Sequence, residues 1–204
     1  MKYNFTNQIM DFIFSNSYIF DKFRNIIHND FKAEKKIISK ILRKDKRTLD
    51  FGCGAGQFSD VFNPDRYHGV DTDKRYIDFC KDNRKGDFFM IKSSPPYKFK
   101  KNYFDQIFVS AVIHHINNKK LSSISKEFSR MLKDNGEIMI VDHFRKEKQP
   151  NLFCKFLIFL DRGKYLRNPD KAIKPFSKEF KIKRFKVFKN WPYKSYILIL
   201  KKRL

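Results

Sequence analysis

Apolar residues recur along the chain at two spacings, and the two spacings alternate. Short, nearly continuous apolar runs are typical of strands covered on both faces. The clearest such run is 104–112, and further strands are expected at 47–51, 66–71, 87–92, 136–144, 181–190 and 193–202. Spacings of three and four residues are typical of amphipathic helices. They predict helices at 21–42, 73–84 and 119–132, the start of another at 57–62, and a helical stretch near 151–174.

Strands that alternate with helices predict right-handed crossovers and a mostly parallel sheet. The expected fold class is therefore α/β: a Rossmann-like, doubly wound sheet of about seven strands with helices on both faces. The short link Trp191-Pro192 joins the last two strands, which makes the C-terminal strand antiparallel. Asn135 and Gly136 offer a left-handed end for the helix that finishes near Leu132.

The 204 residues contain no repeat and no break in composition that would mark a second domain. We expect a single domain over 1–204. Within it, residues 1–44 form an N-terminal helical element on the substrate side. Residues 145–178 form a helical lid inserted between the fifth and sixth strands.

Composition narrows the class of protein. Hydrophobic residues make up 41% of the chain and charged residues 33%, as in folded globular proteins. The three cysteines are scattered without a CxxC pair, which favours a reducing compartment and argues against a disulfide framework or a metal site. The longest apolar run, FLIFL at 156–160, is too short to span a bilayer, and polar residues interrupt the N-terminal aromatic stretch. The expected location is cytoplasmic.

The formal net charge of +23 has two interpretations. It favours an anionic partner such as nucleic acid, a phosphorylated small molecule or a membrane surface. Alternatively it reflects a coding bias, because Lys, Asn, Ile and Phe are abundant together. A discrete nucleic-acid site should concentrate basic residues and aromatics in one stretch, whereas these lysines are spread along the chain. The second interpretation is favoured.

The stretch LDFGCGAG at 49–56 places three glycines directly after the first predicted strand. In open α/β sheets ligands bind outside the carboxyl ends of the strands. Glycines there let the backbone turn sharply and let a ligand pack against it. Asp50, polar at the end of an apolar strand, either anchors the loop or meets a cationic ligand group. Asp71 ends the second strand, where a carboxylate can accept hydrogen bonds from both hydroxyls of a ribose. Glycines and acid together indicate a nucleoside-containing cofactor.

The glycine spacing is GxGxG, whereas a dinucleotide fingerprint is GxGxxG. With this spacing, the stretches LDFGCGAGQF, HGVDTD, FDQIFVSAVIHHI and MLKDNGEIMIVD resemble the motifs of the class I S-adenosylmethionine-dependent methyltransferases. The resemblance covers about residues 45–145. The chain is most similar to the small-molecule branch of that family, related to ubiquinone and other natural-product methyltransferases.

The resemblance implies a binding site for S-adenosylmethionine, with S-adenosylhomocysteine as the product. The glycines would contact the methionine part, Asp71 the ribose and the next two residues the adenosine. Ser110 and Ala111 would lie near the amino-acid part and the transferring methyl. Many members carry an acid after the third strand, where this chain has two serines. The implied cofactor-binding set is Asp50, Gly52, Gly54, Gly56, Asp71, Thr72, Asp73, Ser93, Ser94, Ser110 and Ala111.

The tetrad SPPY at 94–97 is close to the (D/N/S)PPY signature of enzymes that methylate exocyclic amino groups of nucleic acid or protein. In those enzymes the tetrad closes the fourth strand, whereas here it precedes that strand. We therefore interpret Pro95 and Pro96 as residues that stiffen a loop.

Three histidines are candidate general bases. Alignment of the acceptor with the methyl group is the large catalytic contribution, and a base adds to it. All three lie at the ends of the fourth and fifth strands, and a histidine titrates near neutral pH by default. His115 is the first candidate, followed by His143 and His114. Alternatively, one packs against the sheet and another only holds the loop. Arg145 and Lys146 are candidates for binding an acidic substrate group.

The substrate is predicted from two aromatic and apolar segments. Residues 151–169 cover too much of a helix with apolar side chains for one solvated face, and this segment also carries Arg162, Lys164, Tyr165 and Arg167. The N-terminal aromatics form the other wall. We expect a methyltransferase acting on a small molecule with an apolar body and an anionic end. The alternatives are an RNA methyltransferase, a non-catalytic S-adenosylmethionine-binding partner subunit and a nicotinamide enzyme; peripheral membrane contact is compatible with the apolar segment.

Overall fold

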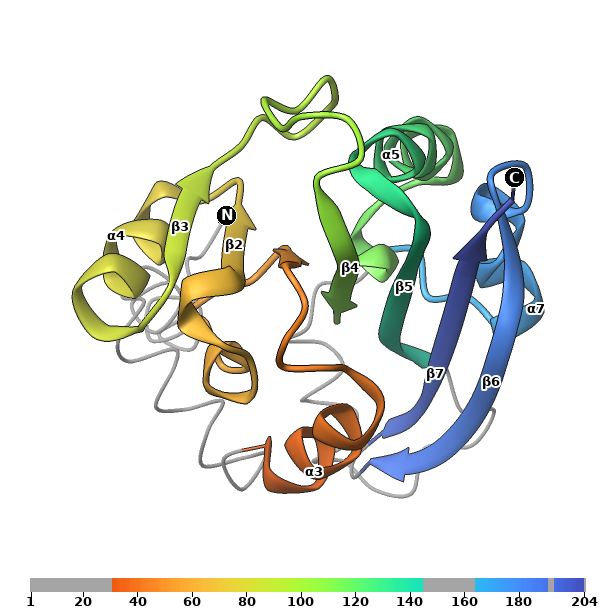
Figure 1. Ribbon diagram of the computed structural model, residues 1–204. Coiled ribbons are helices and arrows are strands. Elements are labelled where there is room, and N and C mark those ends of the chain that lie inside the picture. Colours follow the sequence, from red (N-terminus) through yellow and green to blue (C-terminus); the bar gives the residue numbers. More distant parts are fainter. Residues whose placement is uncertain (1–30, 145–163, 191–192, 204) are drawn as a thin grey trace, which may run out of the picture. The chain divides into compact units, whose positions relative to one another are not determined.

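The computed structural model describes residues 31–144, 164–190 and 193–203 (Figure 1). The described chain divides into two compact units. The first contains the described part of Met1–Asp45 together with Cys53–Ile91, and the second contains Lys46–Gly52 and the chain from Lys92 onward. The predicted single domain over 1–204, with its parts 1–44 and 145–178, stays a prediction. Most of the 1–44 element, the basic pair at 145–146 and the apolar part of the lid lie outside the described residues.

Among its described residues, the first unit has a pair of parallel strands and two α-helices. Its elements are α3 (Lys32–Ile41), the 3₁₀ turns η2 (Ser59–Val61) and η3 (Pro64–Arg66), β2 (Tyr67–Asp71), α4 (Lys74–Asn83) and β3 (Asp87–Met90). In the β2–β3 pair, Asp71 is opposite Met90. The Asp73 carboxylate caps α4 by accepting a hydrogen bond from the backbone N–H of Arg75 at 2.9 Å.

The expected helix start at 57–62 is wrong. This segment instead forms turns and the short η2. The Ser59 N–H and the Ser59 hydroxyl both donate to the carbonyl of Gly56, at 3.1 and 2.9 Å, which closes a tight turn rather than an α-helical one. Phe62 is already extended, so the helical geometry ends there. Apolar spacing alone did not reveal this competing side-chain bond.

The second unit contains five strands in the order β1-β4-β5-β7-β6. Strands β1 (Thr48–Phe51), β4 (Phe104–Ser110) and β5 (Leu132–Phe144) are parallel, while β7 (Tyr193–Lys202) pairs antiparallel with both β5 and β6 (Phe180–Asn190). The helical elements are η4 (Ile113–His115), α5 (Asn118–Met131), α7 (Pro169–Ala172) and η5 (Lys174–Phe176). The described strands thus make a seven-stranded sheet, mostly parallel with antiparallel C-terminal strands, which confirms the predicted fold class.

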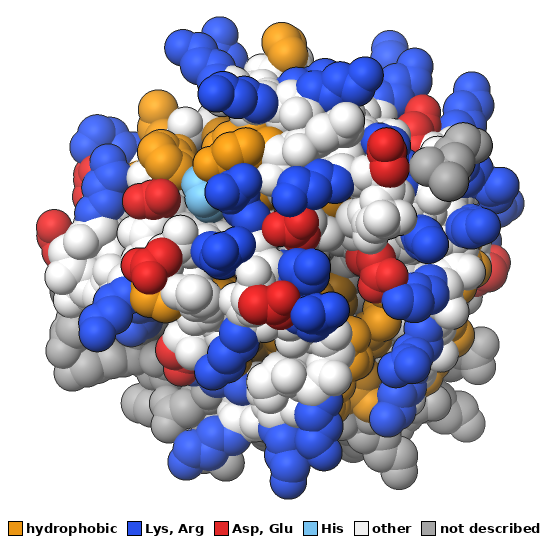
Figure 2. Space-filling model, viewed as in Figure 1, with side chains coloured by type: hydrophobic (Ala, Val, Ile, Leu, Met, Phe, Trp, Pro, Cys, Tyr) orange, Lys and Arg blue, Asp and Glu red, His pale blue; other side chains and the backbone are white. Residues whose placement is uncertain are grey.

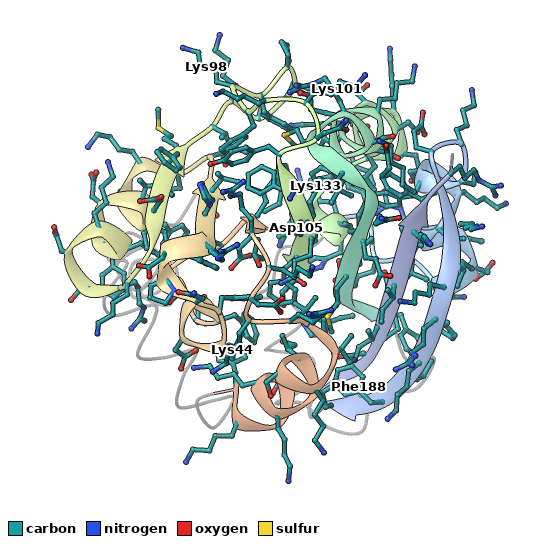
Figure 3. The ribbon with its side chains drawn as sticks, in the orientation of Figure 1. Lys44, Lys98, Lys101, Asp105, Lys133 and Phe188 are labelled. Atoms are coloured by element: carbon teal, nitrogen blue, oxygen red, sulfur yellow. The ribbon has the colours of Figure 1, made fainter. Side chains whose placement is uncertain are left out.

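The expected left-handed helix end at Asn135 and Gly136 is wrong. Helix α5 ends at Met131, and Leu132 is already extended and begins β5. Gly136 lies inside β5, where a Cβ would stand 2.7 Å from Leu132 Cδ2. The glycine therefore serves a close approach within the strand rather than a helix cap. Lys133 in the same stretch donates to Asp105 at 2.7 Å, which ties β5 to the start of β4 (Figure 3).

The core of the second unit lies between the central strands and α5. The fourth strand was expected to be covered on both faces, and its residues Ile107 and Phe108 are fully buried, as is Ile138 of β5. Phe128 of α5 packs edge-on against Phe51 at 5.0 Å between ring centroids. Lys and Arg side chains are distributed over the visible surface (Figure 2). Among the described residues, no helix is both long and apolar enough to cross a membrane.

Candidate active site

The glycine loop of the first unit is fastened to Asp71. The Gly54 N–H donates to Asp71 Oδ2 at 2.9 Å, and the Asp73 N–H donates to Asp71 Oδ1 at 3.0 Å. The loop has two further ties, because the Cys80 thiol donates to the Gly54 carbonyl and Arg84 Nε donates to the Ala55 carbonyl at 3.0 Å. The end of β2 and helix α4 therefore fix the backbone of the loop that follows β1.

The Asp71 carboxylate fits the role of a ribose acceptor. The carboxylate already accepts backbone N–H groups of Gly54, Asp73 and Thr72, and a carboxylate has about four acceptor positions, which leaves room for a hydroxyl of a ligand. Burial raises the pKa of Asp71, while the backbone N–H groups of Asp73 and Gly54 act in the opposite direction. The side chain is nevertheless only partly buried. A ribose hydroxyl could donate a hydrogen bond to this carboxylate, which is partly desolvated and held in a fixed orientation.

The glycines are required by backbone geometry at two positions. Gly52 has φ +78° and a Cβ there would stand 2.4 Å from Val112 Cγ2. Gly56 has φ +70°, and a Cβ would stand 3.0 Å from Arg84 Cγ. Both φ values lie in the left-handed region that favours glycine. A loop with this backbone exposes peptide groups instead of side chains, as close packing of a cofactor requires.

The two residues after Asp71 differ in what they offer a cofactor. Thr72 is exposed. The Asp73 carboxylate already accepts from Arg75 Nε at 3.0 Å and from the Arg75 N–H, and the side-chain hydrogen bond to Arg75 holds the pKa of Asp73 below its usual value. Asp73 therefore caps α4 and binds Arg75, a structural role that was not predicted. Its predicted role was contact with the adenosine.

The second unit places the other implied cofactor residues at strand ends. Ser110 closes β4, and Ala111 has φ +54° while its N–H donates to the Val141 carbonyl at 2.9 Å. Asp50 is 2% exposed near the end of β1, opposite Phe108 of β4. Ser93 and Ser94 are exposed in the loop that precedes β4. Their predicted cofactor contacts stay predictions.

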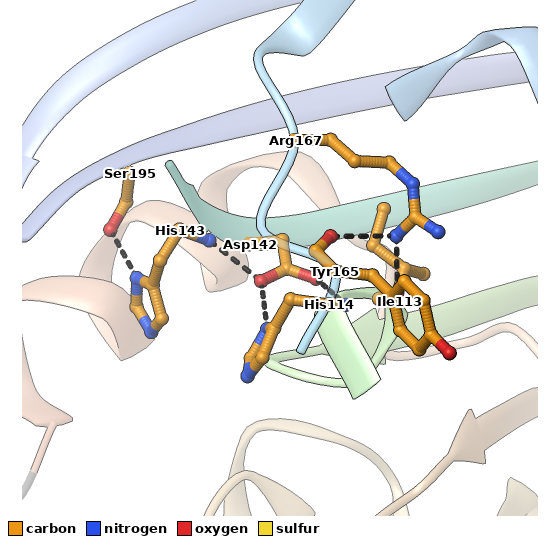
Figure 4. Close-up of polar contacts among 7 residues, drawn as sticks. All are labelled: Ile113, His114, Asp142, His143, Tyr165, Arg167 and Ser195. Carbon is orange, nitrogen blue, oxygen red and sulfur yellow. Dashed lines mark hydrogen bonds and ion pairs between the residues drawn. The ribbon is translucent and has the colours of Figure 1, made fainter. Parts of the chain in front are cut away.

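His114 and Asp142 form a buried pair at the ends of β4 and β5 (Figure 4). His114 Nδ1 lies 2.5 Å from Asp142 Oδ1, and each side chain is 1% exposed. The His114 N–H also donates to Asp142 Oδ2 at 3.2 Å. Burial alone would raise the pKa of Asp142, but the attraction of His114 and His143 and the hydrogen bonds that they donate hold it below its usual value. Asp142 therefore remains a carboxylate that orients His114.

The other two histidines have different surroundings. His143 Nδ1 is 2.7 Å from the Ser195 hydroxyl on β7, and its backbone N–H donates to Asp142 Oδ1 at 2.7 Å. His115 is exposed, and its ring centroid is 4.1 Å from that of His114. The structure thus brings the three predicted bases together. It gives one of them, His114, a buried carboxylate partner.

Arg167 holds the turn that carries His114 and His115. Its guanidinium donates to the carbonyls of Ile113 and Ile116 at 2.8 and 2.6 Å and to Asn118 Oδ1 at 2.8 Å. The Tyr165 N–H adds a bond to the His114 carbonyl at 2.8 Å. The segment with Arg162, Lys164, Tyr165 and Arg167 was expected to bind a carboxylate or phosphate, and for Arg167 this stays a prediction, although these bonds already use most of its donors within the chain. Figure 4 shows Arg167 directed at this turn.

Asp142, Ser195 and Arg84 were absent from the predicted site. A signal for Asp142 was present, because an aspartate ends the apolar run IMIV directly before His143. Ser195 and Arg84 had none, since only the pairing of β5 with β7 and the packing of α4 bring them into contact with His143 and Ala55. Among the described residues, no group of three His, Cys, Asp or Glu side chains is arranged to hold a metal ion.

Comparison with known proteins agrees with this geometry. Residues 49–140 match the model of a family described as methyltransferase domain. The uncharacterized methyltransferase YcgJ of Bacillus subtilis is 29% identical over 134 residues, covering 62% of this chain and 50% of that protein. Phosphoethanolamine N-methyltransferase 3 of Arabidopsis thaliana is 26% identical over 132 residues, covering 61% of this chain and 26% of that protein. A TehB-like S-adenosylmethionine-dependent methyltransferase from Corynebacterium glutamicum has the same fold, with TM-score 0.68, 16% identity, and coverage of 93% of this chain and 99% of that one.

Residues 49–140 thus match a methyltransferase domain, and the described chain shares its fold with S-adenosylmethionine-dependent methyltransferases. These matches bear out the predicted resemblance to the class I methyltransferases and the predicted cofactor, S-adenosylmethionine. The chain spans only a quarter to a half of the length of the curated relatives described above, 26% and 50% respectively.

Proposed function

We propose that this chain transfers a methyl group from S-adenosylmethionine to a small-molecule acceptor. The observation that carries the proposal is the Asp71 carboxylate, which the N–H groups of Gly54 and Asp73 hold in a fixed orientation at the glycine loop. A ribose-binding acid on such a loop, within a matched methyltransferase domain, fits this cofactor better than a nicotinamide dinucleotide.

The bound cofactor would supply a methyl group on a sulfonium centre, which needs little electrophilic assistance. The task of the protein is to bind, to orient and to exclude water. In this proposal Asp71 accepts from the ribose and the loop from Gly52 to Gly56 offers bare backbone. Ser110 and Ala111 contribute the end of β4.

His114 is the base that the geometry supports best. With Nδ1–H donating to Asp142, the lone pair lies on Nε2, which is the nitrogen able to accept a proton. The buried carboxylate would then stabilise the imidazolium that forms. His115 is exposed and the His143 ring bonds the Ser195 hydroxyl, whereas the His114 ring bonds the buried Asp142 directly. His115 and His143 remain candidate bases for an acceptor that binds closer to them than to His114.

A small acceptor with an anionic end is supported by the relative phosphoethanolamine N-methyltransferase, whose name gives a phosphorylated amine as its substrate. The proposal extends to the reaction and to this class of acceptor. An RNA acceptor has the net charge as its only support.

The test is production of S-adenosylhomocysteine by the purified full chain with a panel of phosphorylated amines and apolar anions as acceptors. Turnover that His114→Gln reduces by about 10² or more, while affinity for S-adenosylhomocysteine is retained, would support both reaction and base. Turnover with RNA and with none of the small molecules would refute the acceptor class. Equal turnover by the wild type and His114→Gln would refute the base.

A further inference from the structure

Strand β6 carries an apolar row on one face and a basic row on the other. Ile182, Phe185 and Val187 are 52%, 46% and 44% exposed. They are opposite Leu200, Leu198 and Tyr196 of β7, and opposed residues of an antiparallel pair share a face. The apolar row is thus the exposed continuation of the buried surface of β7 (Figure 1).

The other side of the strand is cationic. Arg184 and Lys186 are opposite Ile199 and Ile197, on the second face, and Lys181 and Lys183 are also exposed. Lys183 pairs with Glu137 at 2.6 Å. Neither β6 nor β7 contains an acidic residue. Figure 2 shows Lys and Arg side chains gathered over the part of the surface that β6 and β7 occupy.

We propose that this surface, the exposed side chains 181–187 of β6, docks on a lipid bilayer that contains anionic headgroups. Strand β6 is at the end of the strand order, so its edge would face the bilayer. The apolar row would enter the boundary between headgroups and acyl chains, and the long lysine and arginine stems of the other face would bend toward the phosphates. This inference concerns a surface of the second unit and does not depend on the acceptor of the methyl group.

Charge and side-chain type favour this partner over two others. A second copy of the chain would bring the same basic strand against the first, and lysines on an edge strand oppose such pairing. Single-stranded nucleic acid would meet the charges, but its bases stack on aromatic rings. Two of the three members of the apolar row, Ile182 and Val187, are aliphatic and match acyl chains instead.

The test is flotation of the full chain with vesicles of phosphatidylcholine alone and vesicles of equal parts phosphatidylcholine and phosphatidylglycerol. Binding to the anionic vesicles, weakened by salt, is expected. Arg184→Glu with Lys186→Glu should lower the partition coefficient at least about tenfold. Phe185→Ser with Val187→Ser should lower it by a similar factor. The matched control, Lys36→Glu with Lys40→Glu, makes the same change in charge at exposed positions of α3 and should have a smaller effect.

A reporter variant keeps the test independent of any folding defect in these changes. Phe185→Trp should show a blue-shifted emission on anionic vesicles and quenching by brominated lipids, beyond the response of the wild type with its single native Trp191. Absence of wild-type binding to anionic vesicles would overturn the proposal. Equal losses of vesicle binding in the β6 and α3 charge variants would also overturn it. So would unchanged binding of the Phe185→Ser, Val187→Ser variant, or no change in the emission of Phe185→Trp on anionic vesicles. Binding of oligouridylate or self-association through β6 in place of vesicle binding would identify a different partner.

Discussion

His114 Nδ1 and Asp142 Oδ1 lie 2.5 Å apart between two side chains that are each 1% exposed. A carboxylate this deeply buried depends on its partner, because removal of one member leaves an uncompensated charge. We expect His114→Leu to lower the free energy of unfolding at neutral pH by about 3 kcal/mol. Urea unfolding measures this, with the exposed His115→Leu as the control, expected within about 0.5 kcal/mol of the wild type. Equal effects of the two variants would show that the pair contributes nothing.

The same pair predicts a pH dependence. The folded-state pKa of Asp142 is lowered by His114 and His143 against the effect of burial. Its contribution to stability is present above the unfolded-state pKa of an aspartate, about 3.9, and is lost as the pH falls through the lower folded value. In His114→Leu the attraction of His114 is gone, so burial should raise the pKa of Asp142. Protonation of Asp142 in acid should then remove its unpaired buried charge and restore stability to that variant. The difference in unfolding free energy between the wild type and His114→Leu should therefore shrink as the pH falls below about 5. A difference that stays constant between neutral and acidic pH would contradict this.

Gly52 is expected to tolerate no side chain. Gly52→Ala adds a Cβ 2.4 Å from Val112 Cγ2 at φ +78°, and should cost about 2 kcal/mol or more in unfolding free energy. In a Val112→Ala background the clash is relieved and only the backbone strain, about 1 kcal/mol, should remain. A double-mutant cycle by urea unfolding measures the coupling. Strict additivity of the two changes would mean that the loop moves away from Val112 without cost.

Tyr97 offers a change that should not destabilise. Its side chain is 5% exposed, and among the described residues its hydroxyl has no hydrogen-bond partner. Burial and the neighbouring Glu127 raise its pKa to about 12, so the hydroxyl stays neutral. Tyr97→Phe should leave the unfolding free energy unchanged or raise it by up to about 1 kcal/mol, because a desolvated donor is removed. A loss greater than about 1 kcal/mol would reveal a bound partner for this hydroxyl.

The sequence revealed the fold where one signal dominated. Apolar runs such as FDQIFVSAV predicted buried strands, and the short Trp191-Pro192 link predicted the antiparallel pair β6–β7, which the structure confirms. Errors arose where two local signals competed. The Ser59 hydroxyl closes a turn in place of a helix, and Gly136 allows close packing in β5 in place of a helix end.

The candidate site was predictable in its residue types but not in its pairings. Three histidines and the strand-terminal acid Asp71 are visible in the sequence. That His114, rather than His115, meets the buried Asp142 depends on the 3₁₀ geometry of the turn Ile113–His115 and on the register of β5. Arg167 likewise contacts this turn through bonds to its backbone carbonyls, and residue types do not encode such bonds.

The most direct test of the central claim is calorimetric titration of the wild type and Asp71→Ala with S-adenosylhomocysteine, with NADH as the ligand control. Asp78→Ala, which removes an exposed acid of α4, is the matched variant. The predicted result is binding by the wild type and Asp78→Ala, a loss of at least about tenfold in Asp71→Ala, and none for NADH. Absence of binding by folded wild-type protein, or equal affinity in Asp71→Ala, would contradict the assignment of this loop to S-adenosylmethionine.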